Sequence, residues 1–248
     1  MKTVKPVADP AKMPSWQKTG SESIESAAAD QRPIVLYFAD ENDSEFEIYG
    51  DDFAELSRAG AMFMKVAYTD DREASPWTEE SVVPTSKLLS ENPSLAYDIP
   101  VGKATVLVCD WYGNEFYRTD TKVRCDKLQA MVEKVADLVE KEISKLQKNV
   151  DKAKEYAEKE DTKNVLKYVM KNFDDGKTGW APIEESIRMY HEVMDELRAQ
   201  KEEMVQKGDV DGLKEMAKVV KKTDLEKEVD EAMEEAARIN VTDPKTGK

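Results

Sequence analysis

Residues 32–46, RPIVLYFADENDSEF, constrain the fold of this chain more than any other stretch. Residues 34–38 (IVLYF) form an unbroken apolar run of β-branched and aromatic side chains, a pattern typical of a strand buried on both faces. The run ends in an acidic loop at residues 40–43, after which Ser44 can cap a helix. In α/β folds functional groups gather at such a junction, because the strand end and the helix N–H groups converge there. This loop contains no cysteine, histidine or glycine, so it carries no obvious reactive group.

The rest of the first half alternates between strand and helix patterns. We expect strands at residues 34–38, 61–68, 105–110 and 115–118, and helices at residues 23–30, 44–59 and 84–95. Gly60 is suited to end the second of these helices in a left-handed conformation. Turn chemistry at residues 111–114 makes the last two strands an antiparallel hairpin, whereas the first two are parallel. The result is a central mixed sheet flanked by helices, preceded by a proline-containing N-terminal arm at residues 1–20.

From Asp126 onward the apolar spacing becomes helical and stays so. A continuous stripe reaches Leu146, and Pro182 suits the first turn of a long helix. Further helices are expected at residues 152–160, 164–173, 181–205, 211–220 and 225–236. These pairs resemble tetratricopeptide-type helices, although no repeat with a fixed period of about 34 residues is present. The second half is therefore predicted to be an all-α domain.

The charge balance restricts the partners of the chain. Its 37 basic and 52 acidic residues give a net charge of −15, which argues against nucleic acid and against anionic membrane surfaces. No run approaches the ~20 apolar residues of a membrane span, so membrane insertion is not expected. The N-terminus has no apolar segment of the signal-peptide type. A soluble protein is expected, cytoplasmic or, if a signal peptide has been removed, periplasmic; oligomeric state stays open.

The order and lengths of the predicted elements resemble those of the thioredoxin family. Residues 33–40 (PIVLYFAD) resemble the strand that enters the Cys-x-x-Cys motif, and residues 97–106 (YDIPVGKATV) resemble the segment with the cis-proline. Residues 110–116 (DWYGNEF) resemble the hairpin that joins the last two strands. The resemblance implies a thioredoxin-like α/β domain at residues 21–147, a helical domain at 148–240 and a polar tail at 241–248. The segment KTGWAPIEESIRMY resembles helical tails of some bacterial proteins of this family.

The same resemblance implies that the catalytic signature is missing. The two motif cysteines fall on Asn42 and Glu45, so no thiol–disulfide oxidoreductase activity is expected. Ala104 stands before Thr105 where the family has its cis-proline, so the bond between Lys103 and Ala104 should be trans. We take Asn42, Glu45, Lys103, Ala104 and the loop residue Trp77 as candidate binding residues around this former active site. No catalytic residue and no cofactor is predicted.

Three functions remain open at this point. The first is a redox-inactive protein-binding or scaffold module that acts through its acidic α/β domain, its helical tail or both, with another protein as partner. The second is an enzyme of the glutathione-transferase type, which also joins a thioredoxin-like domain to a helical one. The third is an acidic cation-binding protein, because residues 40–52 contain seven acidic residues and no basic one. That segment lacks the spacing of a calcium loop, so no metal ligand is assigned.

Other chemically notable residues favour structural roles. Cys109 lies in an apolar strand and is expected in the core, whereas Cys125 opens a polar helix and can be exposed. The spacing of these two cysteines does not indicate a disulfide, although one is possible. His191 has no second ligand beside it and is expected on a helix surface. Trp111 and Trp180 lie in turns, where Trp180 is expected to cover the edge of a core.

Overall fold

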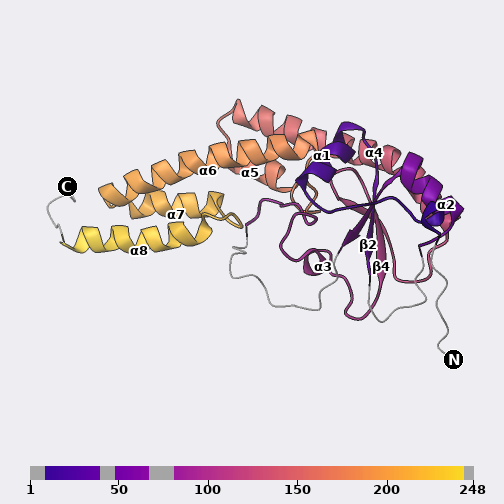
Figure 1. Ribbon diagram of the computed structural model, residues 1–248. Helices are drawn as coiled ribbons and strands as arrows, with labels where there is room; N and C mark the ends of the chain where they lie inside the picture. Colours follow the sequence, from indigo (N-terminus) through magenta and orange to yellow (C-terminus); the bar gives the residue numbers. More distant parts are fainter. Residues whose placement is uncertain (1–8, 40–47, 67–80, 243–248) are drawn as a thin grey trace. The chain divides into compact units, whose positions relative to one another are not determined.

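The computed structural model describes residues 9–39, 48–66 and 81–242 of the 248-residue chain (Figure 1). These residues form two compact units. Unit 1 consists of Met1–Trp77 and Thr85–Glu142, and unit 2 consists of Thr78–Pro84 and Ile143–Lys248. In the part of the chain that the structure describes, no helix is both long and apolar enough to span a membrane.

A mixed five-stranded sheet forms the centre of unit 1. The strands are β1 (Trp16–Gln17), β2 (Ile34–Phe38), β3 (Met62–Val66), β4 (Thr105–Cys109) and β5 (Glu115–Thr119), and their order in the sheet is β1-β3-β2-β4-β5. β3 is parallel to both β1 and β2, whereas β4 is antiparallel to β2 and β5. The predicted α/β class, the parallel pair and the final hairpin are thereby confirmed. β2 and β4 are buried at every position, as their unbroken apolar runs require.

The N-terminal segment was expected to be an arm, but part of it belongs to the sheet. Pro10–Lys12 forms a short 3-10 helix (η1), and the following strand β1 pairs with Phe63 and Met64 of β3. The ring of Trp16 lies 5.8 Å from that of Tyr37 and 5.6 Å from that of Phe63. A two-residue strand has no periodicity to detect, and packing between aromatic rings places it.

Two of the helices predicted in unit 1, at residues 44–59 and 84–95, are shorter than expected, whereas the helix predicted at residues 23–30 is present as α1 (Ser21–Ala29). The other two are α2 (Asp51–Glu55), which continues into a π-helical turn, η2 (Leu56–Gly60), and α3 (Pro93–Ala96). The helix expected at residues 44–59 begins only at Asp51 within the described residues, and Tyr49 lies outside it. Gly60 does end the helix, but not in the left-handed conformation that we expected. The acidic run instead favours Asp51 and Asp52 in the first turn, where the helix dipole stabilises carboxylates.

The helix expected at residues 84–95 is also wrong in extent. Only Pro93–Ala96 is helical, and it is capped by the Asn92 side chain, which accepts a hydrogen bond from the Leu95 N–H at 3.0 Å. Leu88 and Leu89 lie in turns; Leu88 is buried, whereas Leu89 is 52% exposed. Adjacent leucines suggested a helical face, but only one of them packs inward.

Long helices dominate the second half of the chain. They are α4 (Cys125–Ala157), α5 (Thr162–Met170), α6 (Ala181–Lys207), α7 (Val210–Val219) and α8 (Glu226–Thr242). Residues 152–157 were expected to start a separate helix but continue α4, because Val150 and Ala153 extend its buried stripe. α4 therefore contributes residues to both units. Pro182 lies in the first turn of α6, as predicted, and Gly208 ends α6 with a φ of 64°.

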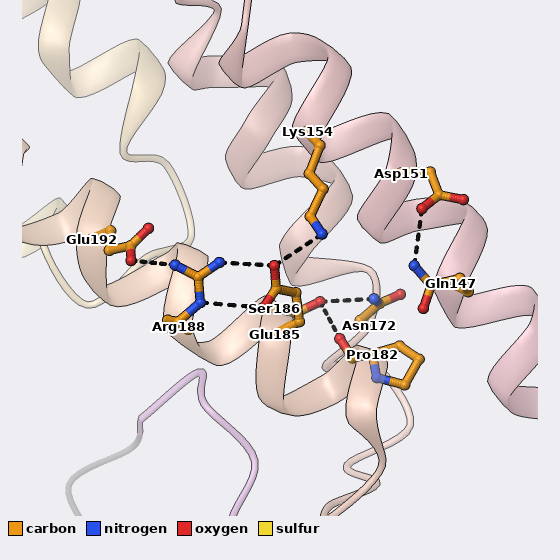
Figure 2. Close-up of polar contacts among 9 residues, drawn as sticks. All are labelled: Gln147, Asp151, Lys154, Asn172, Pro182, Glu185, Ser186, Arg188 and Glu192. Atoms are coloured by element: carbon orange, nitrogen blue, oxygen red, sulfur yellow. Dashed lines mark hydrogen bonds and ion pairs between the residues drawn. The ribbon is translucent and has the colours of Figure 1, made fainter.

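A buried polar cluster joins α4, the turn after α5, and α6. The Asn172 amide nitrogen donates to the Leu146 carbonyl at 3.2 Å and to Ser186 Oγ at 2.8 Å, while Asn172 Oδ1 accepts from Asn149 at 2.8 Å. Ser186 Oγ in turn donates to the Pro182 carbonyl at 2.7 Å (Figure 2). Asn172 and Ser186 are buried, and each finds its hydrogen-bond partners within the cluster.

A segment distant in sequence completes the core of unit 2. Val82 and Val83 pack against the helical core, and the Val82 N–H donates to Asp224 Oδ1 at 3.2 Å. The other oxygen of Asp224 accepts from the Tyr190 hydroxyl at 3.1 Å, and the Asp224 N–H donates to that hydroxyl at 3.2 Å. Residues 81–84 thus pack with helices more than 100 positions later in the chain, although they lie among the strands in sequence.

Candidate functional site

The strand register brings two of the predicted site residues to one end of the sheet. Phe38, the last residue of β2, pairs with both Val66 of β3 and Thr105 of β4. Lys103 and Ala104 directly precede Thr105, so they lie at the end of the sheet where β2 and β3 finish. This is the end at which α/β folds place their ligands. The other three candidates, Asn42, Glu45 and Trp77, lie outside the described residues.

The segment before β4 combines a buried and an exposed position. Ala104 is 0% exposed, whereas Lys103 lies at the surface and pairs with Asp120 at 3.2 Å. Gly102 has a φ of 73°, and the preceding Val101 is 61% exposed. The described residues contain no cis peptide bond, so the bond between Lys103 and Ala104 is trans, as predicted. The exposed groups of this turn are one aliphatic side chain and one ammonium group.

Tyr97 supports this turn through its ring and its hydroxyl group. The Tyr97 ring packs edge-to-face against Phe38 at 5.8 Å, and its hydroxyl donates to the Gly113 carbonyl at 2.6 Å. Burial, with further contributions from Cys109, Asp110 and Glu115, raises the Tyr97 pKa far above its usual value. Tyr97 therefore stays a neutral hydrogen-bond donor.

Arg118 fixes the backbone that enters the turn. Its guanidinium donates to the Tyr97 carbonyl at 2.6 Å and to the Asp98 carbonyl at 3.2 Å. It also forms a two-point ion pair with Glu115, at 2.8 and 2.6 Å, and this hydrogen bonding raises the Arg118 pKa. Asp98 has a φ of 50°, which is unusual for a residue other than glycine. Sequence reasoning missed Arg118 and Tyr97, because their partners are carbonyl groups about 20 residues away, which leave no periodic signal.

Both thiols of the chain lie in settings that disfavour thiol chemistry. Cys109 is 0% exposed and pairs with Ile34, at the other end of β4 from Thr105. Cys109 lies four residue steps along β4 from Thr105, or about 13 Å. Cys125 is half-buried, and burial, together with the charges of Asp52 and Asp126, raises its pKa. The two cysteines are not joined in a disulfide.

A cleft in unit 1 lies beside Cys125. It has a volume of about 550 Å³, and its lining residues come from α2, η2 and the start of α4; they include Asp52, Glu55, Leu56 and Cys125. Asp126, which also lines it, is held by Arg124 in a two-point ion pair that lowers the Asp126 pKa. Within residues 9–39, 48–66 and 81–242, no group of three or more histidine, cysteine, aspartate or glutamate side chains is arranged to hold a metal ion.

His191, Trp180 and Trp111, which the sequence analysis also singled out, lie on a helix, at a helix start and in a turn. His191 is exposed on α6, as predicted, and its ring lies 5.9 Å from that of Tyr190. Trp180 is buried at the start of α6, also as predicted, and Trp111 is buried in the turn between β4 and β5.

Comparisons of the chain with protein-family models, with curated proteins and with solved structures return no match. The functional assignment therefore depends on the geometry described above.

Proposed function

We propose that this protein is a redox-inactive, thioredoxin-like binding module that carries a C-terminal helical extension and recognises another protein. The arrangement of the sheet supports the proposal: a parallel pair, β2 and β3, is followed by an antiparallel hairpin, β4 and β5. This is the order of elements on which the resemblance to thioredoxins depends.

The placement of the two thiols carries the proposal. Thioredoxin chemistry needs a thiolate at the end of the sheet where β2 finishes. The only two cysteines of the chain are Cys109, buried at the opposite end of β4, and Cys125, whose pKa is raised rather than lowered. Neither can replace the motif cysteines that the resemblance aligns with Asn42 and Glu45.

The surface at this end of the sheet suits binding better than catalysis. Val101 offers an exposed aliphatic group, and Lys103 a cation whose ion pair with Asp120 is itself solvent-exposed. An exposed pair of this kind contributes little to stability, so Lys103 can exchange Asp120 for a carboxylate of a partner at small cost. Arg118 and Tyr97 hold the turn in place, which lowers the entropy lost on binding.

Placing cysteines at the two positions aligned with the Cys-x-x-Cys motif tests whether that alignment is correct. In a Cys125→Ser background, we expect Asn42→Cys/Glu45→Cys to gain insulin reduction with dithiothreitol as reductant, whereas the unaltered chain shows no rate above the dithiothreitol background. The matched control is Ser44→Cys/Glu47→Cys, which keeps the same spacing two residues out of register. We expect no activity from it. Equal activity of the two variants, or turnover by the unaltered chain, would contradict the proposal.

The binding role has its own test. A partner captured by the full chain and then purified is titrated against the unaltered protein and against Val101→Asp/Lys103→Glu. We expect at least tenfold weaker binding by the variant, since one substitution removes an apolar contact and the other reverses a charge. Unchanged affinity would remove this surface from the proposal. Retention of the unaltered chain on immobilised glutathione would instead favour an enzyme of the glutathione-transferase type.

A further inference from the structure

Two stacked tyrosines on unit 2 are surrounded by lysines. The rings of Tyr156, near the end of α4, and Tyr168, on α5, lie 5.6 Å apart with an angle of 15° between their planes. The Lys159 ammonium lies over the Tyr156 ring at 5.4 Å. Lys167 and Lys171 lie over the Tyr168 ring at 5.8 and 4.6 Å. Cation–π contacts therefore hold these three ammonium groups close to the two stacked tyrosine rings.

In the described part of the chain, no carboxylate lies within ion-pair distance of Lys159, Lys167 or Lys171. Two acidic groups close to them in sequence make their hydrogen bonds with other partners: Glu155 pairs with Lys152 at 2.9 Å, and Asp161 caps α5 by accepting from the backbone and side chain of Asn164 at 3.1 and 2.7 Å. Both also interact electrostatically with Lys159, but neither is within ion-pair distance of it. Most other helices of unit 2 pair their basic residues with acids, as in Lys154–Glu185, Arg188–Glu192, Lys201–Glu228, Lys214–Asp211 and Lys218–Glu215. α5 is therefore a locally basic face on a chain with a net charge of −15.

The lysines of α5 also form a row. Lys163, Lys167 and Lys171 are four residues apart, and all three are exposed. Lys171 follows the last helical residue and keeps helical dihedral angles, so the row has helical spacing throughout. Like charges four residues apart repel one another along a helix. Anionic groups of a partner placed between these lysines would offset this repulsion.

The spacing of the row matches an extended peptide. Four residues of helix rise about 6 Å, and two residues of extended chain span about 6.6 Å. Carboxylates at alternate positions of an extended peptide would therefore meet successive lysines of the row. Nucleic acid fits less well, because one face of each tyrosine ring packs on the other ring and lysines lie over the rings, which leaves no free face for a base.

We propose that the row formed by Lys163 and Lys167 of α5 and its C-cap Lys171, with Lys159 beside it, binds an extended acidic peptide segment of a partner protein that carries carboxylates at alternate positions. This inference rests on the proposed protein-binding function and names a surface and a ligand chemistry for it. Binding is electrostatic in this description, so it should weaken as salt rises.

Fluorescence anisotropy with the full chain tests the proposal. The probe is a labelled peptide with four glutamates alternating with serines, and the comparison peptide has the same composition with its glutamates contiguous. We expect the alternating peptide to bind more tightly. Lys167→Gln/Lys171→Gln should weaken its binding by about fivefold to tenfold, because two exposed charge pairs are lost. Lys167→Arg/Lys171→Arg should retain it.

The matched control is Lys214→Gln/Lys218→Gln, which removes two lysines with the same spacing from α7, where each pairs with an acidic residue. We expect its affinity to stay within about twofold of the unaltered chain. Equal affinity for the two peptides, an equal loss in the control, or tighter binding of oligothymidine than of the alternating peptide would overturn the proposal. Failure here leaves the Asn42→Cys/Glu45→Cys test unaffected, so failure of this inference and failure of the proposed function are separately visible.

Discussion

At the scale of single residues, the turn between β4 and β5 shows how one side chain organises several others. Asp110 is buried, and its Oδ1 accepts from the N–H groups of Tyr112 and Asn114, each at 2.9 Å. Its Oδ2 accepts from the Asn114 side chain at 2.8 Å. Gly113 completes the turn with a φ of 87° and presents its carbonyl to Tyr97. The turn thus holds the tyrosine that supports the candidate site.

Replacing Gly113 by alanine should destabilise unit 1. A Cβ atom there would lie 3.0 Å from the Tyr97 hydroxyl oxygen and 3.2 Å from Leu88 Cβ, in a backbone conformation that side chains disfavour. We expect Gly113→Ala to lower the free energy of unfolding by ~2 kcal/mol, measured by urea denaturation followed by tryptophan fluorescence. Gly20→Ala is the control, since nothing lies within 4 Å of its Cβ position. Equal losses in both variants would refute the steric explanation.

At the scale of elements, ion pairs join the end of α4 to α6. Glu185 pairs with Lys154 of α4 at 3.1 Å and with Arg188 of its own helix at 2.8 Å (Figure 2). Hydrogen bonds from Arg188 and Lys154 lower the Glu185 pKa from 4.5 to about 2. A lowered pKa in the folded state stabilises the protein above the unfolded value, and this contribution is lost as the pH falls from about 4.5 toward 2.

Glu185→Gln should therefore change stability in a pH-dependent way. At pH 7 we expect the variant to be less stable by up to about 1 kcal/mol, because the pairs are partly exposed. The difference should shrink below about pH 4.5 and vanish only below about pH 2, where the wild-type carboxylate becomes protonated. Chemical denaturation across this pH range measures it. Glu231→Gln, on the exposed face of α8, serves as the control and should show no such trend; a difference that is constant with pH would contradict the explanation.

Comparing the predicted and observed bounds of the helices and strands shows which of them local sequence defines and which depend on packing. β2 and β4 were predicted almost to the residue, because an unbroken apolar run is visible in any context. The continuity of α4 was missed, since residues 147–152 (QKNVDK) are polar apart from Val150. That valine is nonetheless buried, and a single buried position per turn suffices where neighbouring helices cover it.

At the scale of the whole molecule, sequence order and spatial order diverge at residues 81–84. Val82 and Val83 are partly buried against the core of unit 2, and the Leu146 carbonyl accepts a hydrogen bond from Asn172 there. A fragment with the predicted limits 148–240 would lack all three. Its core would be left with uncovered apolar surface and a buried amide without one acceptor, which is costly.

Asp224 provides a test of this long-range packing. We expect Asp224→Ala to speed hydrogen exchange of the Val82 amide by about threefold to tenfold, because its acceptor is lost. Exchange measured by mass spectrometry on a peptide covering residues 81–84 would report it, with Asp230→Ala, exposed on α8, as the control. No change in exchange would mean that packing of Val82 and Val83 alone holds the segment.

Some residues of the candidate site were predicted from the sequence, and others were found only in the structure. Lys103 and Ala104 were identified from the sequence and lie beside the end of β2, because strand patterns fix which residues flank them. Val101, Tyr97 and Arg118 were not identified, since exposure and side-chain bonds to distant carbonyls have no local signature. The same holds for the tyrosine stack beneath the α5 lysines, which joins residues from two helices.

The sequence by itself therefore determined the α/β class and the core strands, because apolar periodicity and residue identity are local properties. Only the tertiary structure decided that Trp16 and Gln17 add a strand, that residues 81–84 pack with the helices and that the α5 lysines form no close ion pair among the described residues. Each of these depends on groups brought together from distant parts of the chain. The contacts between these groups contribute to stability only after folding has brought distant parts of the chain together.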